Sequence, residues 1–230
     1  HKVVEGAQYL DPKLIEATPG IAVEAVKNEC AYMGFLVIHL LDSVQEVFFN
    51  DKKDLIPKIE ETEAKIDQLH KAVKAYAEDI MQAGISDDAA RVLTLYVASS
   101  GNIERIGDYA TNMVELAQRL QSENAAFSDM AKKELALITQ AVNEILEITV
   151  DAFSKDDNEA AKAIEPLEET IDDMIMMLKD RHTKRLKNGQ CSIASGLVFM
   201  EALTYFERAS DQCSSIAVMM LARHNEQILQ

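Results

Sequence analysis

Acidic side chains spaced four residues apart recur in this chain and are its strongest candidates for chemistry. Glu104 and Asp108 form one such pair within "NIERIGDYATN", where Ile103 and Ile106 flank them in place of the lysines that usually offset acids on a helix. On a helix, the two carboxylates lie on one face about 6 Å apart along the axis. Like charges at this spacing destabilise a helix, so a bound cation would relieve the repulsion.

The same spacing is repeated in both halves of the chain. "YFERASDQCSS" carries an ExxxD pair 103 positions after the first, and two further pairs are separated from each other by 105 positions. The candidate metal ligands are Glu63, Asp67, Glu104, Asp108, Glu168, Asp172, Glu207 and Asp211. Ligation by oxygen alone suits Fe, Mn, Mg, Ca or Zn. Because 39 residues are acidic, a solvated acidic helix face is the alternative interpretation.

Long helices must position these acids. Apolar residues recur every three or four positions, and the chain has only 8 Gly and 4 Pro, which predicts an all-α fold. Ser86 and Ser128 are candidate N-caps, and Gly84 is a candidate helix stop. Stripes of this period predict near-parallel helices in two tandem three-helix bundles, placed end to end and joined around residues 121–129. The predicted divisions are a junction segment at 1–20, a first repeat at 21–121 and a second at 128–226.

Composition narrows the classes of function. The net charge of −16 disfavours nucleic acid as a partner, and Cys30, Cys191 and Cys213 have neither disulfide nor zinc-knuckle spacing. The longest apolar stretch, residues 31–41, is shorter than a membrane span, which predicts a soluble piece. The start at His1 suggests an excised segment with more chain upstream. One basic run, "KDRHTKRLKNG" (residues 179–189), complements a helix dipole or could contact an anionic headgroup or partner.

The two ExxxD motifs resemble the paired E(D)xxxD signatures of the PhoU phosphate-uptake regulator family, over nearly the whole chain. That resemblance implies two three-helix bundles with polynuclear iron or zinc clusters at Glu104 and Asp108, with Asn112 as an extra ligand, and at the second motif. The second motif departs from the first, with "ASD" for "IGD" and Ser215 where Asn112 would have its counterpart. Arg105 and Arg208 are expected to orient the acids by hydrogen bonding, the alternative being that they pair with Glu side chains on a neighbouring helix.

The segment "YLDPKLIEATPGIAVEAVKNE" is similar to the junction before the PhoU-like cytosolic domain of bacterial sodium/phosphate cotransporter family proteins. The resemblance implies an upstream transmembrane transporter domain on the same polypeptide and a position at the cytoplasmic face of the bacterial inner membrane. Long striped helices can also pair between chains, so a homodimer stays open.

Three functions follow as hypotheses. The first is a regulatory or accessory domain of a sodium-dependent phosphate transporter, with no catalytic role, that binds metal. The second is a metal-free helical scaffold for protein contacts. The third is a carboxylate-bridged di-metal enzyme, which the lack of any Glu-x-x-His spacing in the sequence disfavours. The sequence also lacks a Gly-rich phosphate loop and an H-E-x-x-H motif.

Overall fold

The computed structural model describes residues 6–229, apart from the side chains of 227 and 229. The first five residues of the predicted junction segment lie outside the described residues. Within the described range the chain is helical and contains no strand, which confirms the predicted all-α class. The elements are α1 (Pro12–Ala17), α2 (Pro19–Asn50), η1 (Lys53–Leu55), α3 (Ile56–Ala83), α4 (Asp87–Ser122), α5 (Asp129–Lys155), α6 (Asn158–Ala161), α7 (Ile164–Lys187) and α8 (Ile193–Leu229).

Local signals set the helix ends. The Ser86 hydroxyl accepts from the backbone N–H of Ala89 at the start of α4, and the Ser128 hydroxyl accepts from that of Ala131 at the start of α5. Gly84 follows α3 with φ of +86°, a conformation that L side chains rarely adopt. These boundaries agree with the sequence-based prediction because capping depends only on residues within one helical turn.

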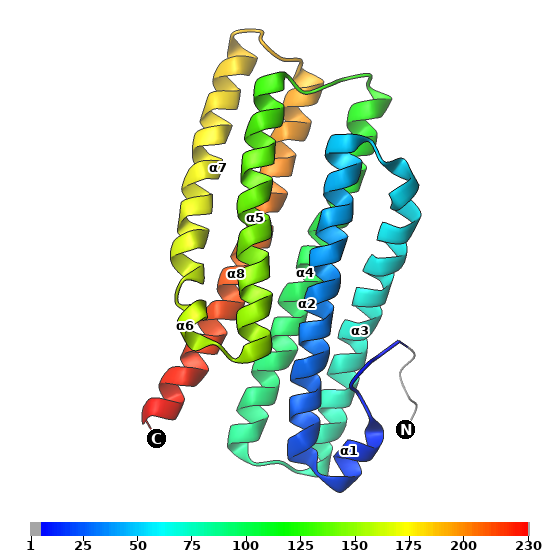
Figure 1. Ribbon diagram of the computed structural model, residues 1–230, viewed down its shortest axis with the longest axis vertical. Coiled ribbons are helices and arrows are strands. Elements are labelled where there is room, and N and C mark those ends of the chain that lie inside the picture. The colour runs from blue at the N-terminus through cyan, green and yellow to red at the C-terminus, as the bar shows by residue number, and fades with distance from the viewer. Residues whose placement is uncertain (1–5, 230) are drawn as a thin grey trace.

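Two three-helix units, α2–α3–α4 and α5–α7–α8, make up the molecule. Figure 1 shows that they stand side by side with their long axes roughly aligned, so the end-to-end arrangement expected from the sequence is wrong. Helix α2 lies against α5, and α4 lies against α8 along much of their length. The two units share one continuous hydrophobic core, which explains why they pack along their sides instead of at their tips.

Polar contacts also cross between the units. The side-chain amides of Gln45 on α2 and Asn143 on α5 donate to each other, at 2.6 and 2.9 Å. The rings of Tyr109 on α4 and Tyr205 on α8 stack with centroids 6.2 Å apart. These contacts join the two units across their shared side.

Helix α2 has the length and apolar composition of a membrane span. In this fold it is a core helix, because α3, α4 and α5 all pack against it. Its side chains at Val26, Cys30, Met33 and Val37 are fully buried inside the bundle. The apolar character of this helix therefore has an explanation within the fold.

Candidate metal centres

The first group of acids lies between α3 and α4. Helix α3 supplies Glu63 and Asp67, and α4 supplies Glu104 and Asp108. The acids are only half-buried, while neighbouring apolar residues such as Ile66 and Ile103 are buried in the core. Packing of that apolar stripe therefore brings four carboxylates from two helices to the rim of one seam.

The electrostatics of this first group show how strongly the carboxylates interact. Burial, together with the charge of Asp108 and a hydrogen bond to it, raises the pKa of Glu104 to about 7. Burial and then a hydrogen bond to Asp108 also raise the pKa of Glu63. A hydrogen bond between two carboxyl groups requires a shared proton. Glu63 and Asp108 therefore interact across the two helices, which the i,i+4 spacing on either helix did not show.

The second group lies between α7 and α8 and is tighter. One carboxylate oxygen from each of Glu168, Asp172 and Asp211 lies within 4.8 Å of the others. Burial, followed by hydrogen bonds to Asp211 and Asp172, raises the pKa of Glu168 to about 8. Burial also raises the pKa of Asp211. Among the described residues this is the group of three carboxylates that approach one another so closely, and it takes Asp211 from the second motif and both acids from the α7 pair, but not Glu207.

The chemistry of the second group fits a metal ion. Oδ1 of Asp172 is buried and, apart from the carboxyl of Glu168, has no hydrogen-bond partner among the described residues. A buried carboxylate oxygen without a donor is costly, and a cation is the partner that its charge and position favour. The donor set consists of carboxylate oxygens alone, which suits the hard and borderline ions predicted from the sequence.

Two lysines contact these acids, and neither contact was predicted from the sequence. Lys71 Nζ lies 2.9 Å from Asp67 Oδ2 in the first group, and Lys179 Nζ lies 3.5 Å from Glu207 Oε2 in the second. Lys71 follows Asp67 by four residues on the same helix, so its spacing was a visible signal. Lys179 and Glu207 belong to different helices, so no local pattern could reveal their contact. Each ammonium offsets part of the local negative charge.

The predicted role of the repeated arginines is wrong. Arg105 donates to the side chains of Asn102 and Gln212, which links α4 to α8. Arg208 lies over the ring of Tyr205. Their partners are therefore amides and an aromatic ring. Asn112 is half-buried one turn beyond Asp108, and among the described residues it takes no part in the carboxyl interactions above.

Comparisons with known proteins identify the family. A model of the PhoU domain matches residues 31–117 and 135–220, one match in each unit. The chain is 24% identical over 193 residues to phosphate-specific transport system accessory protein PhoU homolog 1 of Thermotoga maritima, and the match covers 83% of this chain and 82% of that protein. It is 23% identical to the PhoU homolog of Synechocystis sp., over 85% of this chain and 86% of the relative.

Solved structures share the fold. The crystal structure of the phosphate transport system regulatory protein PhoU from Streptococcus pneumoniae superposes with a TM-score of 0.80 at 17% identity, covering 90% of this chain and 97% of that one. PhoU from Pseudomonas aeruginosa gives a TM-score of 0.81 at 21% identity, covering 88% and 97%. The domain matches span well over half of the chain, which therefore belongs to the PhoU domain family.

Proposed function

We propose that this chain is a regulatory or accessory protein of phosphate transport that holds metal ions at the two carboxylate groups and performs no catalysis. Membership of the PhoU domain family supports the regulatory role, as do relatives named as accessory proteins of phosphate-specific transport. The observation that carries the metal assignment is the second group, where three carboxylate oxygens converge and Asp172 Oδ1 lacks a donor.

A more specific proposal concerns how this chain is connected to a transporter. The resemblance of the N-terminal segment to a sodium/phosphate cotransporter junction supports a transmembrane transporter domain on the same polypeptide, with this domain at the cytoplasmic face. The described part of that segment is held against α2, because Glu29 accepts from the backbone N–H groups of Gln8 and Tyr9 at 3.1 and 2.9 Å. The Tyr76 hydroxyl donates to the Asp11 carbonyl at 2.8 Å. A complete gene product without hydrophobic spans ahead of residue 1 would contradict this finer proposal.

The chain's own residues have separate tasks in this proposal. Glu168, Asp172 and Asp211 would hold an ion in the second centre, and Glu63, Glu104 and Asp108 would hold one in the first. A bound ion would supply positive charge that replaces the protons now shared between carboxyl groups. Lys179 would keep Glu207 at the edge of the second centre. The ion would join α3 to α4 and α7 to α8, so metal occupancy would stiffen both seams.

Elemental analysis of protein purified without chelator or nickel resin tests the metal assignment. Fe, Zn or Mn is expected, with one site's share lost in the Glu104→Ala/Asp108→Ala variant and the other's in Glu207→Ala/Asp211→Ala. The matched control is Glu147→Ala/Asp151→Ala, an exposed ExxxD pair on α5, which should keep all of the metal. Metal-free native protein, or full metal content in both site variants, would overturn the assignment.

A cellular measurement tests the regulatory role separately. Deleting the domain should change phosphate uptake or its response to external phosphate, and restoring the native chain should reverse the change. Unchanged uptake and an unchanged response after deletion would contradict a role in phosphate transport, whatever the metal content.

A further inference from the structure

Charge is distributed very unevenly over this acidic protein. Residues 128–134 and 179–190 contain three acidic residues, Asp129, Glu134 and Asp180, and seven basic ones, Lys132, Lys133, Lys179, Arg181, Lys184, Arg185 and Lys187. The rest of the chain contains 36 acidic and 16 basic residues, a formal charge of −20. We call the surface formed by Lys133, Arg181, Lys184, Arg185 and Lys187 the basic corner.

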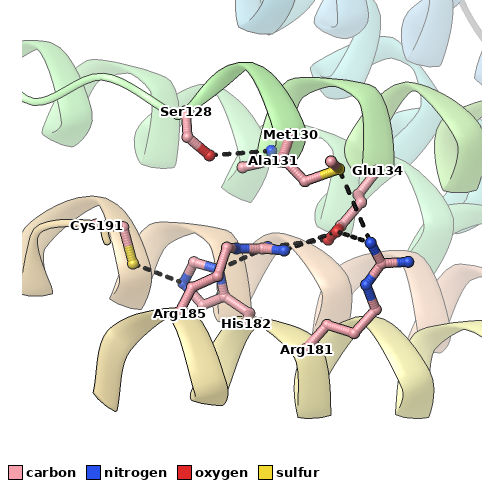
Figure 2. Close-up of polar contacts among 8 residues, drawn as sticks. All are labelled: Ser128, Met130, Ala131, Glu134, Arg181, His182, Arg185 and Cys191. Atoms are coloured by element: carbon pink, nitrogen blue, oxygen red, sulfur yellow. Dashed lines mark hydrogen bonds and ion pairs between the residues drawn. The ribbon is translucent and has the colours of Figure 1, made fainter. Parts of the chain in front are cut away.

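The buried carboxylate of Glu134 holds two helices of this corner together (Figure 2). Glu134 on α5 is buried and accepts two hydrogen bonds from the Arg185 guanidinium on α7, at 2.7 and 2.9 Å. Arg181 reaches the same carboxylate at 3.4 Å and the sulfur of Met130 at 3.8 Å. The bidentate contact pins the C-terminal end of α7 to the N-terminal end of α5. The negative charge of Glu134 is therefore neutralised inside the protein and is not presented at the surface.

Most of the remaining cations face solvent. The side chains of Lys184 and Arg181 are 71% and 52% exposed, and Lys133 and Lys187 are exposed as well. Asp180 pairs with Lys184 at 3.0 Å but is itself 65% exposed, so this contact is weak. The basic corner therefore presents net positive charge outward.

A rigid platform lies beneath the corner. The His182 ring stacks on Phe199 with centroids 4.2 Å apart, and its Nδ1 accepts from Arg185 Nη2 at 3.0 Å. A Cβ added at Gly196 would lie 2.6 Å from a Leu186 methyl group, which shows how closely the start of α8 approaches the end of α7. The ends of α5, α7 and α8 are thus held together at one end of the bundle (Figure 1).

Exposed apolar side chains occur at this same end. Met130 is 46% exposed beside Arg181, and Ile193 and Leu197, in the first two turns of α8, are 75% and 58% exposed. Exposed cations combined with exposed Leu, Ile and Met residues are the pattern of protein surfaces that bind at the interface of an anionic bilayer.

We propose that the basic corner docks on the anionic phospholipid headgroups of a membrane, with Met130, Ile193 and Leu197 entering the interface. Lipids diffuse within a bilayer, so anionic headgroups can gather beneath lysines whose side chains are flexible. An acidic protein would instead need a carboxylate fixed opposite each lysine. The −20 charge of the remainder repels an anionic bilayer, so only an approach through this end is attractive. The inference deepens the proposed function and rests on it for its setting beside a transporter.

Vesicle sedimentation of the whole chain tests the docking. The chain should sediment with phosphatidylcholine vesicles that contain about one third phosphatidylglycerol and not with phosphatidylcholine alone. Raising salt from about 50 to about 500 mM should abolish the binding because it screens the charges. The Lys184→Glu/Lys187→Glu variant should lower the partition coefficient by about 20-fold or more.

Matched variants make each result decisive. Lys155→Glu/Lys162→Glu reverses two exposed lysines near the far end of α5 and in the segment after α6, and should leave binding unchanged or slightly reduced. Ile193→Ser/Leu197→Ser should weaken binding while preserving its salt dependence. Failure of the native chain to bind anionic vesicles, or an equal loss in the Lys155/Lys162 control, would overturn the proposal. Tighter binding to a polyglutamate peptide than to vesicles would do so too, in favour of an acidic protein partner.

The vesicle assay contains no transporter and needs no metal. A negative result there would leave the proposed role in phosphate transport intact, since uptake measurements test that role. Conversely, normal vesicle binding combined with unchanged phosphate uptake in the deletion strain would contradict the proposed function and leave the docking surface standing.

Discussion

At the scale of single residues, the protein keeps carboxylates where they repel one another. Glu168 shares hydrogen bonds with Asp211 and Asp172 in the second group, and burial makes its ionised form unfavourable. Such an arrangement costs stability unless protons or cations compensate it. The acid groups therefore do not stabilise the fold in their ionised form, which agrees with the proposed metal binding.

The pH dependence of stability follows from these carboxyl groups. In the folded metal-free chain the pKa values of Glu104 and Glu168 are about 7 and about 8, above the ordinary value of 4.5. The folded state therefore binds more protons than the unfolded state in this window, and its free energy of unfolding should fall as pH rises from about 4.5 to about 8. Urea titrations with chelator at about pH 5.5 and about pH 8.5 check this; equal or higher stability at the upper pH would contradict it.

A neutral substitution at the second group should separate metal binding from stability. Glu168→Gln removes the most strongly perturbed charge, so the metal-free variant should melt at a higher temperature than native protein above pH 8 and should lose metal affinity. Thermal melts with chelator and metal titrations measure the two effects. The neighbouring exposed residue supplies the control, Glu169→Gln, which should change neither. A lower melting temperature for Glu168→Gln would count against like-charge repulsion.

Neutralising the acid of the buried ion pair in Figure 2 should lower stability, whereas neutralising Glu168 should raise it. Glu134→Gln leaves Arg185, whose side chain is 12% exposed, without a compensating charge. The expected loss is about 3 to 5 kcal/mol of unfolding free energy, measured by urea denaturation. Glu144→Gln, at an exposed site on the same helix, is the control and should change stability by less than about 0.5 kcal/mol. Equal effects would mean that the pair contributes nothing specific.

At the scale of elements, the α2–α5 crossing depends on the absence of a side chain at Gly34. A Cβ there would lie 2.9 Å from both methyl groups of Val150. Because a β-branched residue has little rotamer freedom in a helix, the two helices themselves would have to separate.

Gly34→Ala should therefore cost about 1 to 3 kcal/mol despite its better helix propensity. Gly20→Ala on the same helix is the control, since nothing lies within 4 Å of its added Cβ. That variant should be neutral or should gain about 0.5 kcal/mol from helix propensity. Denaturation of the two variants in parallel provides the measurement. A stabilised Gly34→Ala protein would show that α2 and α5 can move apart freely.

At the scale of the whole molecule, the shared core should make the two units unfold together. Leu93→Ala in the first unit and Leu135→Ala in the second each empty a fully buried position. Each should lower the midpoint of the same single transition, by about 2 to 5 kcal/mol in free energy. Circular dichroism and tyrosine fluorescence, which includes the Tyr109–Tyr205 pair between the units, should follow one curve. Two separated transitions would indicate independent units.

Much of the fold and the site could be predicted from the sequence. Helix boundaries at Ser86 and Ser128, the duplication, and the four candidate ExxxD pairs all depend on residues within a few positions of one another or on a repeat that can be read directly. The pairs fall on α3, α4, α7 and α8 as predicted. Local propensity and periodicity suffice for these features because each is determined within a single helix.

Contacts between helices were decided by the tertiary structure alone. The side-by-side packing of the units joins residues on different helices, and so does the link between Glu134 and Arg185. The same holds at the second group, where Asp211 contacts Glu168 and Glu207 contacts Lys179. Helical periodicity states which face of a helix is apolar but leaves open which neighbour covers it. Only burial of all six long helices in one shared core chooses those neighbours, and that choice brings acids of two helices to each seam and the cations to one end.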